Sequence, residues 1–159
     1  MYVDRTKSAA DNMLALINAT NEATLSFNDL TLGAPVTLPP VYLPKADPED
    51  PDEPQVIDRS ADNTRIKVTG KGDYSDETDL TYRRLDLDFE VQYLRYEATD
   101  FIDWTDFKTQ FAVKNDIRVE DLQFAPDAMP ATAGLNLVTV TPINNSMLYV
   151  GTKNIRINV

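Results

Sequence analysis

Residues 14–35 read LALINATNEATLSFNDLTLGAP, and residues 107–126 read FKTQFAVKNDIRVEDLQFAP. The two stretches share a pattern of apolar residues around one aspartate, with a constant offset between the copies. The matched pairs are Leu25 with Ile117, Phe27 with Val119, Asp29 with Asp121, Leu30 with Leu122 and Leu32 with Phe124. A one-residue gap then aligns the two Ala-Pro pairs that end the stretches. Each stretch includes the end of a helix-like segment and precedes strand-like sequence, so we interpret the chain as two tandem copies of one small unit.

Two segments are predicted to be helical, residues 5–19 and residues 100–113. Both place apolar side chains at the spacing of an amphipathic helix. In the first segment the positions i, i+3, i+4 and i+7 are Ala10, Met13, Leu14 and Ile17. Trp104, the only tryptophan, falls on the second helix and is expected to pack in the core, rather than to serve as a ligand platform.

The clearest strand signal lies in residues 79–96. The odd positions from Leu85 to Tyr93 are all apolar and the even positions between them are polar. This alternation predicts one long half-buried strand, or two strands joined by a bend, that ties the two halves together. Further predicted strands cover residues 64–70, 135–141, 147–150 and 153–159.

Each half thus has the order helix, irregular strand, loop, strand, turn, strand. We predict an α+β fold in which two tandem copies of a small helix–strand–strand unit share one β core. The first repeat covers residues 1–88 and the second covers residues 89–159. They form one structural domain, because a half of this size alone would bury too little surface to be stable.

The matched aspartates, Asp29 and Asp121, sit where the alternation of each copy slips by one residue. One interpretation makes them a catalytic pair related by the repeat. The other makes each a cap for a turn of its own backbone, and we favour it. Two carboxylates with no setting that raises a pKa and no company of metal ligands do not make a site.

Residues 35–63 are an insertion that the second half lacks. Seven of the ten prolines lie between Pro35 and Pro54, so this segment is predicted to be an extended arm. Its first part is apolar and includes Val41, Tyr42 and Leu43, whereas residues 47–54 are mostly acidic and lack the glycine and the alternating acids of a calcium loop. We expect the arm to lie on a surface, such as that of a neighbouring subunit.

Composition narrows the function classes. The formal net charge is −11, which disfavours nucleic acid and anionic membranes as partners. The chain has no histidine and no cysteine, so catalytic triads and dyads that need either residue are excluded, and we expect no metal site and no cofactor. No run of about 18 apolar residues occurs, so no membrane span is expected, and the start of the chain lacks the apolar region of a secretory signal.

Two stretches resemble a known family. TKSAADNMLALINATN at residues 6–21, followed by DLTLGAP at residues 29–35, is similar to the start of small uncharacterised virion structural proteins of large tailed bacteriophages. YRRLDL at residues 82–87 resembles a later strand of that family. The resemblance covers about a third of the chain plus this strand, and the Pro-rich arm departs from the shorter loop expected there. It implies a location in the virion, assembled in the host cytoplasm, and it brings no catalytic residues.

The first functional hypothesis is therefore a virion building block, in the head decoration, neck, tail or baseplate. It would act without enzymatic chemistry, as a homo-oligomer that contacts other copies of itself and other virion proteins. The residues expected at contacts are Val41, Tyr42 and Leu43 in the arm, with the exposed aromatics Tyr2 and Tyr74.

The alternative is a receptor- or glycan-binding module of a phage fibre or cell surface. Tyr74, Tyr149 and Trp104 would then stack on sugar rings. A third class, an enzyme that uses carboxylates alone, needs a positioned acid pair, and no spacing in the sequence marks one.

Overall fold

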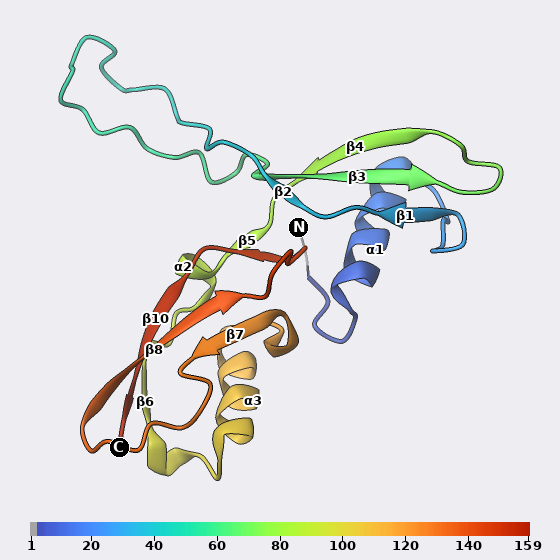
Figure 1. The fold of residues 1–159 in the computed structure, drawn as a ribbon. Coiled ribbons are helices and arrows are strands. Elements are labelled where there is room, and N and C mark those ends of the chain that lie inside the picture. Colours follow the sequence, from blue (N-terminus) through green and yellow to red (C-terminus); the bar gives the residue numbers. More distant parts are fainter. Residues whose placement is uncertain (1–2) are drawn as a thin grey trace.

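A computed structural model describes residues 3–159 as a mixed α+β fold (Figure 1). The helices are α1 (Ala9–Asn21), the short α2 (Leu87–Glu90) and α3 (Trp104–Asn115), and 3₁₀ turns lie at Ala98–Asp100 and Val119–Asp121. The strands before residue 85 are β1 (Leu30–Leu32), β2 (Val36–Thr37), β3 (Thr64–Gly70) and β4 (Glu77–Tyr82). The later strands are β5 (Leu85–Asp86), β6 (Arg95–Glu97), β7 (Leu122–Ala125), β8 (Leu135–Pro142), β9 (Tyr149–Val150) and β10 (Lys153–Asn158). None of the described helices is long and apolar enough to cross a membrane.

The first sheet is built around β3, which pairs antiparallel with β1, β2 and β4. Helix α1 covers one face of it. The helix begins where Ser8 Oγ accepts a hydrogen bond from the Asp11 amide at 3.1 Å, and it ends at Glu22, which has a left-handed backbone. Side chains alternate along β3, so every second one points toward the helix. The buried cluster comprises Met13, Ile17, Leu30, Ile66, Val68 and Tyr82.

The second sheet has the order β6-β10-β8-β7, with β6 parallel to β10 and the other pairs antiparallel. Helix α3 packs on its inner face through aromatic side chains, among them Phe107, whose ring meets that of Tyr96 edge-on at 5.2 Å between centroids. Such pairs add to the stabilisation that their buried area already gives. The buried cluster comprises Leu87, Val91, Tyr96, Phe101, Phe107, Phe111, Ile117, Leu122, Phe124, Val138, Val140, Leu148, Tyr149, Ile155 and Ile157.

The expectation of one β core shared by both halves is wrong. The buried residues form two separate clusters, one on each four-stranded sheet. The reason is that each sheet has a helix of its own to cover its inner face. The halves meet through a small parallel sheet of β5 and β9, and through Met147, which packs against the first cluster.

The prediction of a long strand over residues 79–96 is also wrong. The structure divides this segment into β4, β5, the short helix α2 and β6. The Asp86 side chain accepts a hydrogen bond from the Asp88 amide at 3.0 Å and so caps α2. Leu87 and Val91 are buried, whereas Phe89 between them is exposed. Spacing of four residues, typical of a helix, therefore decides which of these side chains enters the core.

The Pro-rich insertion leaves the body between β2 and β3 as a long two-stranded loop (Figure 1, cyan to green). Its outgoing and returning strands pair at a β-bridge between Tyr42 and Ile57. The segment is extended, as predicted. It projects away from both sheets of its own chain and does not lie on either of them.

Candidate functional site

The two strands of the arm present a band of exposed apolar side chains. Val41, Tyr42 and Leu43 on the outgoing strand and Val56 and Ile57 on the returning strand each keep between 45% and 56% of their surface exposed. These residues are neighbours across the ribbon and not scattered singly. Contiguous exposed apolar surface of this kind is typical of an interaction site.

Backbone hydrogen bonds hold this band in shape. The Leu43 amide donates to the Val56 carbonyl at 2.8 Å, and the Asp58 amide donates to the Val41 carbonyl at 2.7 Å. Prolines before and after the pairs restrict the backbone further. The arm is therefore a stiff ribbon, although it has no hydrophobic core of its own.

The tip of the arm is acidic and internally hydrogen-bonded. Glu53 accepts from the amides of Ala46 and Asp47 at 3.0 and 2.9 Å. The Lys45 ammonium donates to the Asp50 carbonyl at 2.7 Å. Between residues 45 and 53 the tip holds five carboxylates and one lysine, which gives a net charge of −4. The tip thus carries a concentrated negative charge on an ordered turn.

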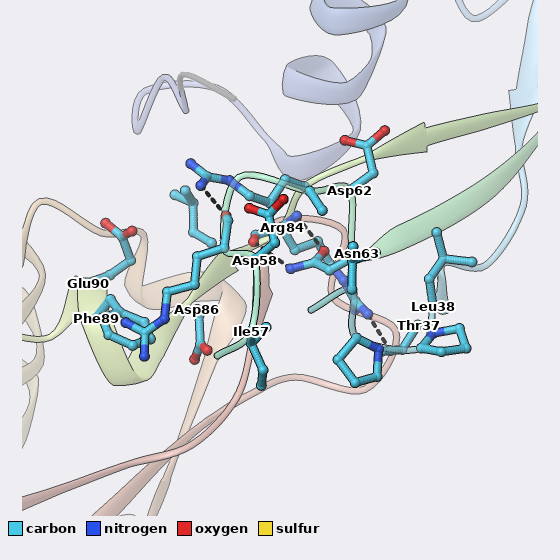
Figure 2. A pocket seen from close by; sticks show the side chains of 17 residues that line it. Thr37, Leu38, Ile57, Asp58, Asp62, Asn63, Arg84, Asp86, Phe89 and Glu90 are labelled. Atoms are coloured by element: carbon cyan, nitrogen blue, oxygen red, sulfur yellow. Dashed lines mark hydrogen bonds between the residues drawn. The ribbon is translucent and has the colours of Figure 1, made fainter. Parts of the chain in front are cut away.

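Arg84 fixes the base of the arm to the body (Figure 2). Its side chain is buried, and its guanidinium donates to the hydroxyls of Thr37 and Thr64 at 2.6 and 2.7 Å and to the Ser146 carbonyl at 2.8 Å. All three acceptors are uncharged. One side chain therefore joins the start of the arm, the first sheet and the second half of the chain.

A cavity of about 420 Å³ lies between the arm base and the segment from Arg83 to Glu90. Figure 2 shows the side chains of its lining. The guanidinium carbon of Arg59 lies 3.4 Å from the centroid of the Phe89 ring. This cation–π contact closes one side of the cavity. The apolar part of the lining comes from both sides of the cavity: Leu38, Pro39, Pro40, Val41, Ile57 and Ala61 on the arm, and Leu85 and Phe89 opposite them.

Two charged groups that line this cavity have pKa values shifted from their usual values. Hydrogen bonds from the Ser60 hydroxyl and amide hold the pKa of Asp58 below its usual value, so this carboxylate stays ionised near neutral pH. Burial lowers the pKa of Arg84 below its usual value, and its donors are taken by the three contacts above. Within residues 3–159, no three potential ligands among His, Cys, Asp and Glu are grouped to hold a metal ion.

The sequence-predicted contact residues are only partly brought together. Val41, Tyr42 and Leu43 lie side by side on the arm, as expected. Tyr74 is exposed, but it lies in the turn between β3 and β4, at the opposite end of the first sheet from the arm (Figure 1). Tyr2 lies outside the described residues.

Sequence reasoning missed the returning strand of the band and its anchor. Val56 and Ile57 are an apolar pair in a polar stretch, placed after the acidic tip much as Val41 to Leu43 are placed before it. That symmetry was the available signal. Arg84 shares the alternation of Leu80 and Tyr82, so it could have been assigned to the inner face.

The three aromatics considered for stacking on sugars do not form one platform. Tyr149 is fully buried, and its hydroxyl accepts from the Arg118 amide at 2.9 Å. Trp104 stacks on Phe107 with 4.7 Å between ring centroids, and its indole nitrogen donates to Asp127 at 2.7 Å. Trp104 is partly buried and packs against the second cluster, so the prediction that it lies in the core is confirmed in part.

The aspartates of the repeated stretch lie in separate halves and have different partners. Asp29 accepts from the Ser26 amide and hydroxyl at 2.8 and 2.7 Å, which is the predicted turn cap. Asp121 is buried and pairs with Arg118 at 2.9 Å. The turn-capping interpretation holds for the first aspartate, whereas an ion pair replaces it in the second.

Comparison of this chain with protein-family models, with curated proteins and with solved structures finds no match.

Proposed function

We propose that this chain is a non-enzymatic structural protein of a bacteriophage virion, in the head decoration, neck, tail or baseplate. It would join other copies of itself and other virion proteins through the arm. The observation that carries the proposal is the band of exposed apolar side chains on a stiff ribbon that projects from the body. The resemblance of residues 6–21 and 82–87 to phage virion proteins supplies the setting.

The energetics of the arm favour a role in binding. Covering the half-exposed band, from Val41 to Leu43 and at Val56 and Ile57, would contribute about 1 kcal/mol per side chain. Because the ribbon is already stiffened by prolines and backbone pairs, less conformational entropy is lost when it docks. The same residues contribute little to the core of their own chain.

We propose further that the two halves are tandem copies of one α-β-β-β unit. Two observations support this. The Asp29 carbonyl accepts from the Lys71 amide at 2.8 Å, and the Asp121 carbonyl accepts from the Ile143 amide at 2.9 Å. The strand that follows each aspartate then pairs antiparallel with the central strand of its sheet, β1 with β3 and β7 with β8. The arm would be an insertion into the first copy only.

The test is removal of the arm without disturbing its base. Residues 42–57 are replaced by Asn-Gly, since the Val41 carbonyl and the Asp58 amide lie 2.7 Å apart and can flank a tight turn. Val36 and Thr37 must stay, because they pair with β3. We expect an unchanged circular dichroism spectrum and loss of the protein from purified virions.

A matched control removes apolar surface elsewhere. Ile102→Ser with Val113→Ser takes away two exposed side chains near and on α3. This variant should enter particles normally. Normal incorporation of the arm deletion would overturn the proposal.

A further inference from the structure

The outer face of the second sheet carries a row of exposed side chains that crosses three strands. Leu137 on β8 lies opposite Arg156 on β10, and Arg156 lies opposite Arg95 on β6. With Leu94 and Asn154 these residues line a depression of about 490 Å³. The face is therefore hollowed and partly apolar, and it carries two arginines. Glu97 shares the exposed face of β6 with Arg95, and its carboxylate accepts a hydrogen bond from the Asn158 side chain at 2.7 Å.

The two arginines on this face have no acidic partner. Neither Arg95 nor Arg156 forms an ion pair with any of residues 3–159. Like charges that face each other across strands repel, so the pair is unfavourable until an anion neutralises it. In a chain whose formal net charge is −11, this is an uncommon place to leave two cations together.

The outer face of the first sheet makes the contrast plain. There Arg65 forms an ion pair with Asp79 at 3.5 Å, and Lys67 forms one with Glu77 at 2.7 Å, each diagonally across the β3–β4 pair. Each cation on β3 has a carboxylate on β4. Both sheets carry two cations on their outer face, but the cations of the first sheet form ion pairs and those of the second sheet do not.

The arm carries the complementary surface. Its tip has a net charge of −4, and the apolar band lies directly beside the tip. The second-sheet face likewise places its two arginines next to Leu94, Leu135 and Leu137, all exposed. In the structure the arm points away from the second sheet of its own chain (Figure 1).

We propose that the outer face of the second sheet is the docking site for the arm of a second copy of this chain. The acidic tip would lie over Arg95 and Arg156, and the apolar band would cover the leucines. This rests on the proposed structural role and specifies the partner of the arm. Because arm and face are different surfaces, the contact is heterologous and joins subunits head to tail, into a ring or a filament.

The experiment measures molar mass by light scattering over a range of concentrations and at two ionic strengths. Wild type should associate, and high salt should weaken the association. Arg95→Gln with Arg156→Gln should weaken it at least tenfold. The control, Arg65→Gln with Lys67→Gln, removes an equal number of positive charges from the first sheet and should associate like wild type.

Mixing gives the sharper test. The variant without residues 42–57 keeps the face, and the Arg95→Gln, Arg156→Gln variant keeps the arm. Each alone should be monomeric, and the mixture should form a complex of one copy of each. As a second measurement, the absence of natural cysteines allows a specific trap: Asp52→Cys at the tip should form a disulfide with Leu137→Cys of another copy, but not with Val113→Cys on α3.

The outcomes separate this inference from the proposed function. Association that survives the loss of both arginines, or a tip cysteine that prefers Val113→Cys, would overturn the inference. A wild type that is monomeric throughout, together with Asp52→Cys and Leu137→Cys variants that form no disulfide-linked dimer, would also overturn it. In each of these cases the virion-incorporation test of the arm deletion still decides the structural role independently.

Discussion

Arg84 donates from Nε to the Thr64 hydroxyl at 2.7 Å, in a part of the protein where both residues are buried. The contact lies at the junction of the two halves, because the same guanidinium also reaches the Ser146 carbonyl. A cation held only by neutral acceptors retains its charge at a desolvation cost that these bonds must offset.

Arg84→Met should lower the free energy of unfolding by about 2–4 kcal/mol, because it strips donors from buried oxygens of Thr64 and Ser146. Urea denaturation measures the change. Arg83→Met is the matched control, since Arg83 is the neighbouring residue and donates only to the Arg59 carbonyl on the exposed side. Equal stability of the two variants would mean that the buried contacts do not hold the halves.

Alkaline pH should destabilise the fold through three buried tyrosines. Burial raises the pKa values of Tyr82, Tyr96 and Tyr149 from 10.0 to about 12. The unfolded chain therefore releases these protons first, so stability is full below pH 10 and falls as the pH rises toward 12. The loss is at most roughly 2–3 kcal/mol per tyrosine, and denaturation curves between pH 9 and pH 12 measure it.

Two single substitutions test this assignment. The Tyr82 hydroxyl has no hydrogen-bond partner in the described part of the chain, so Tyr82→Phe should raise stability by about 1 kcal/mol and flatten the alkaline loss. Tyr93→Phe, at an exposed position, should change neither. An unchanged alkaline profile in the Tyr82→Phe protein would contradict the role of that tyrosine.

Two separate cores should respond separately to cavities. Ile66→Ala and Ile155→Ala each truncate a fully buried side chain, one in each cluster, at a cost of about 3 kcal/mol. Trp104 packs against the second cluster, so its fluorescence reports that half alone. In the Ile66→Ala protein, circular dichroism should begin to change at a lower temperature than Trp104 fluorescence.

The control for this experiment is Ile155→Ala, in which the fluorescence change should be complete at a lower temperature than the change in circular dichroism. Coincident transitions by both probes in both variants would show that the halves unfold as one cooperative unit. The junction around Arg84 would then be strong enough to couple them.

Gly151→Ala should be costly because two constraints meet there. Gly151 has a φ of 80°, and an added Cβ would collide with the Asp86 carboxylate across the β5–β9 pair. We expect a loss of about 2 kcal/mol or more in the free energy of unfolding. Gly72 has a φ of 62° but open space around it, so Gly72→Ala should lose only about 1 kcal/mol.

The sequence predicted the secondary structure best where a pattern of apolar residues fitted only one kind of element. The alternation of residues 64–70 predicts β3, and Ile66 and Val68 are buried on it. The odd-numbered apolar residues from Leu85 to Tyr93 had two meanings, because Leu87 and Val91 are also one helical turn apart. The helical turn is the one observed, and the Asp86 side chain caps it through a local hydrogen bond.

Part of the candidate site could also be predicted from the sequence. The prolines and the run of apolar residues indicated Val41 to Leu43. The residues opposite them, among them Ile57, are set by how the arm folds back at its tip, which the sequence pattern does not show. The separation of Tyr74 from the arm depends on the length of β3, which places the two at opposite ends of the sheet. The number of cores depended on tertiary packing, since the same amphipathic elements could build one core or two.

The hydrogen bond between Val41 and Asp58 affects how the length of the arm can change. The Asp58 amide donates to the Val41 carbonyl at 2.7 Å, so the two ends of the segment between them are held at a fixed separation. Doubling the length of such an excursion costs only about 0.6 kcal/mol of closure entropy. The segment between Val41 and Asp58 can therefore be lengthened, shortened or replaced, which would change the reach of the arm, while the sequence of the two sheets is kept.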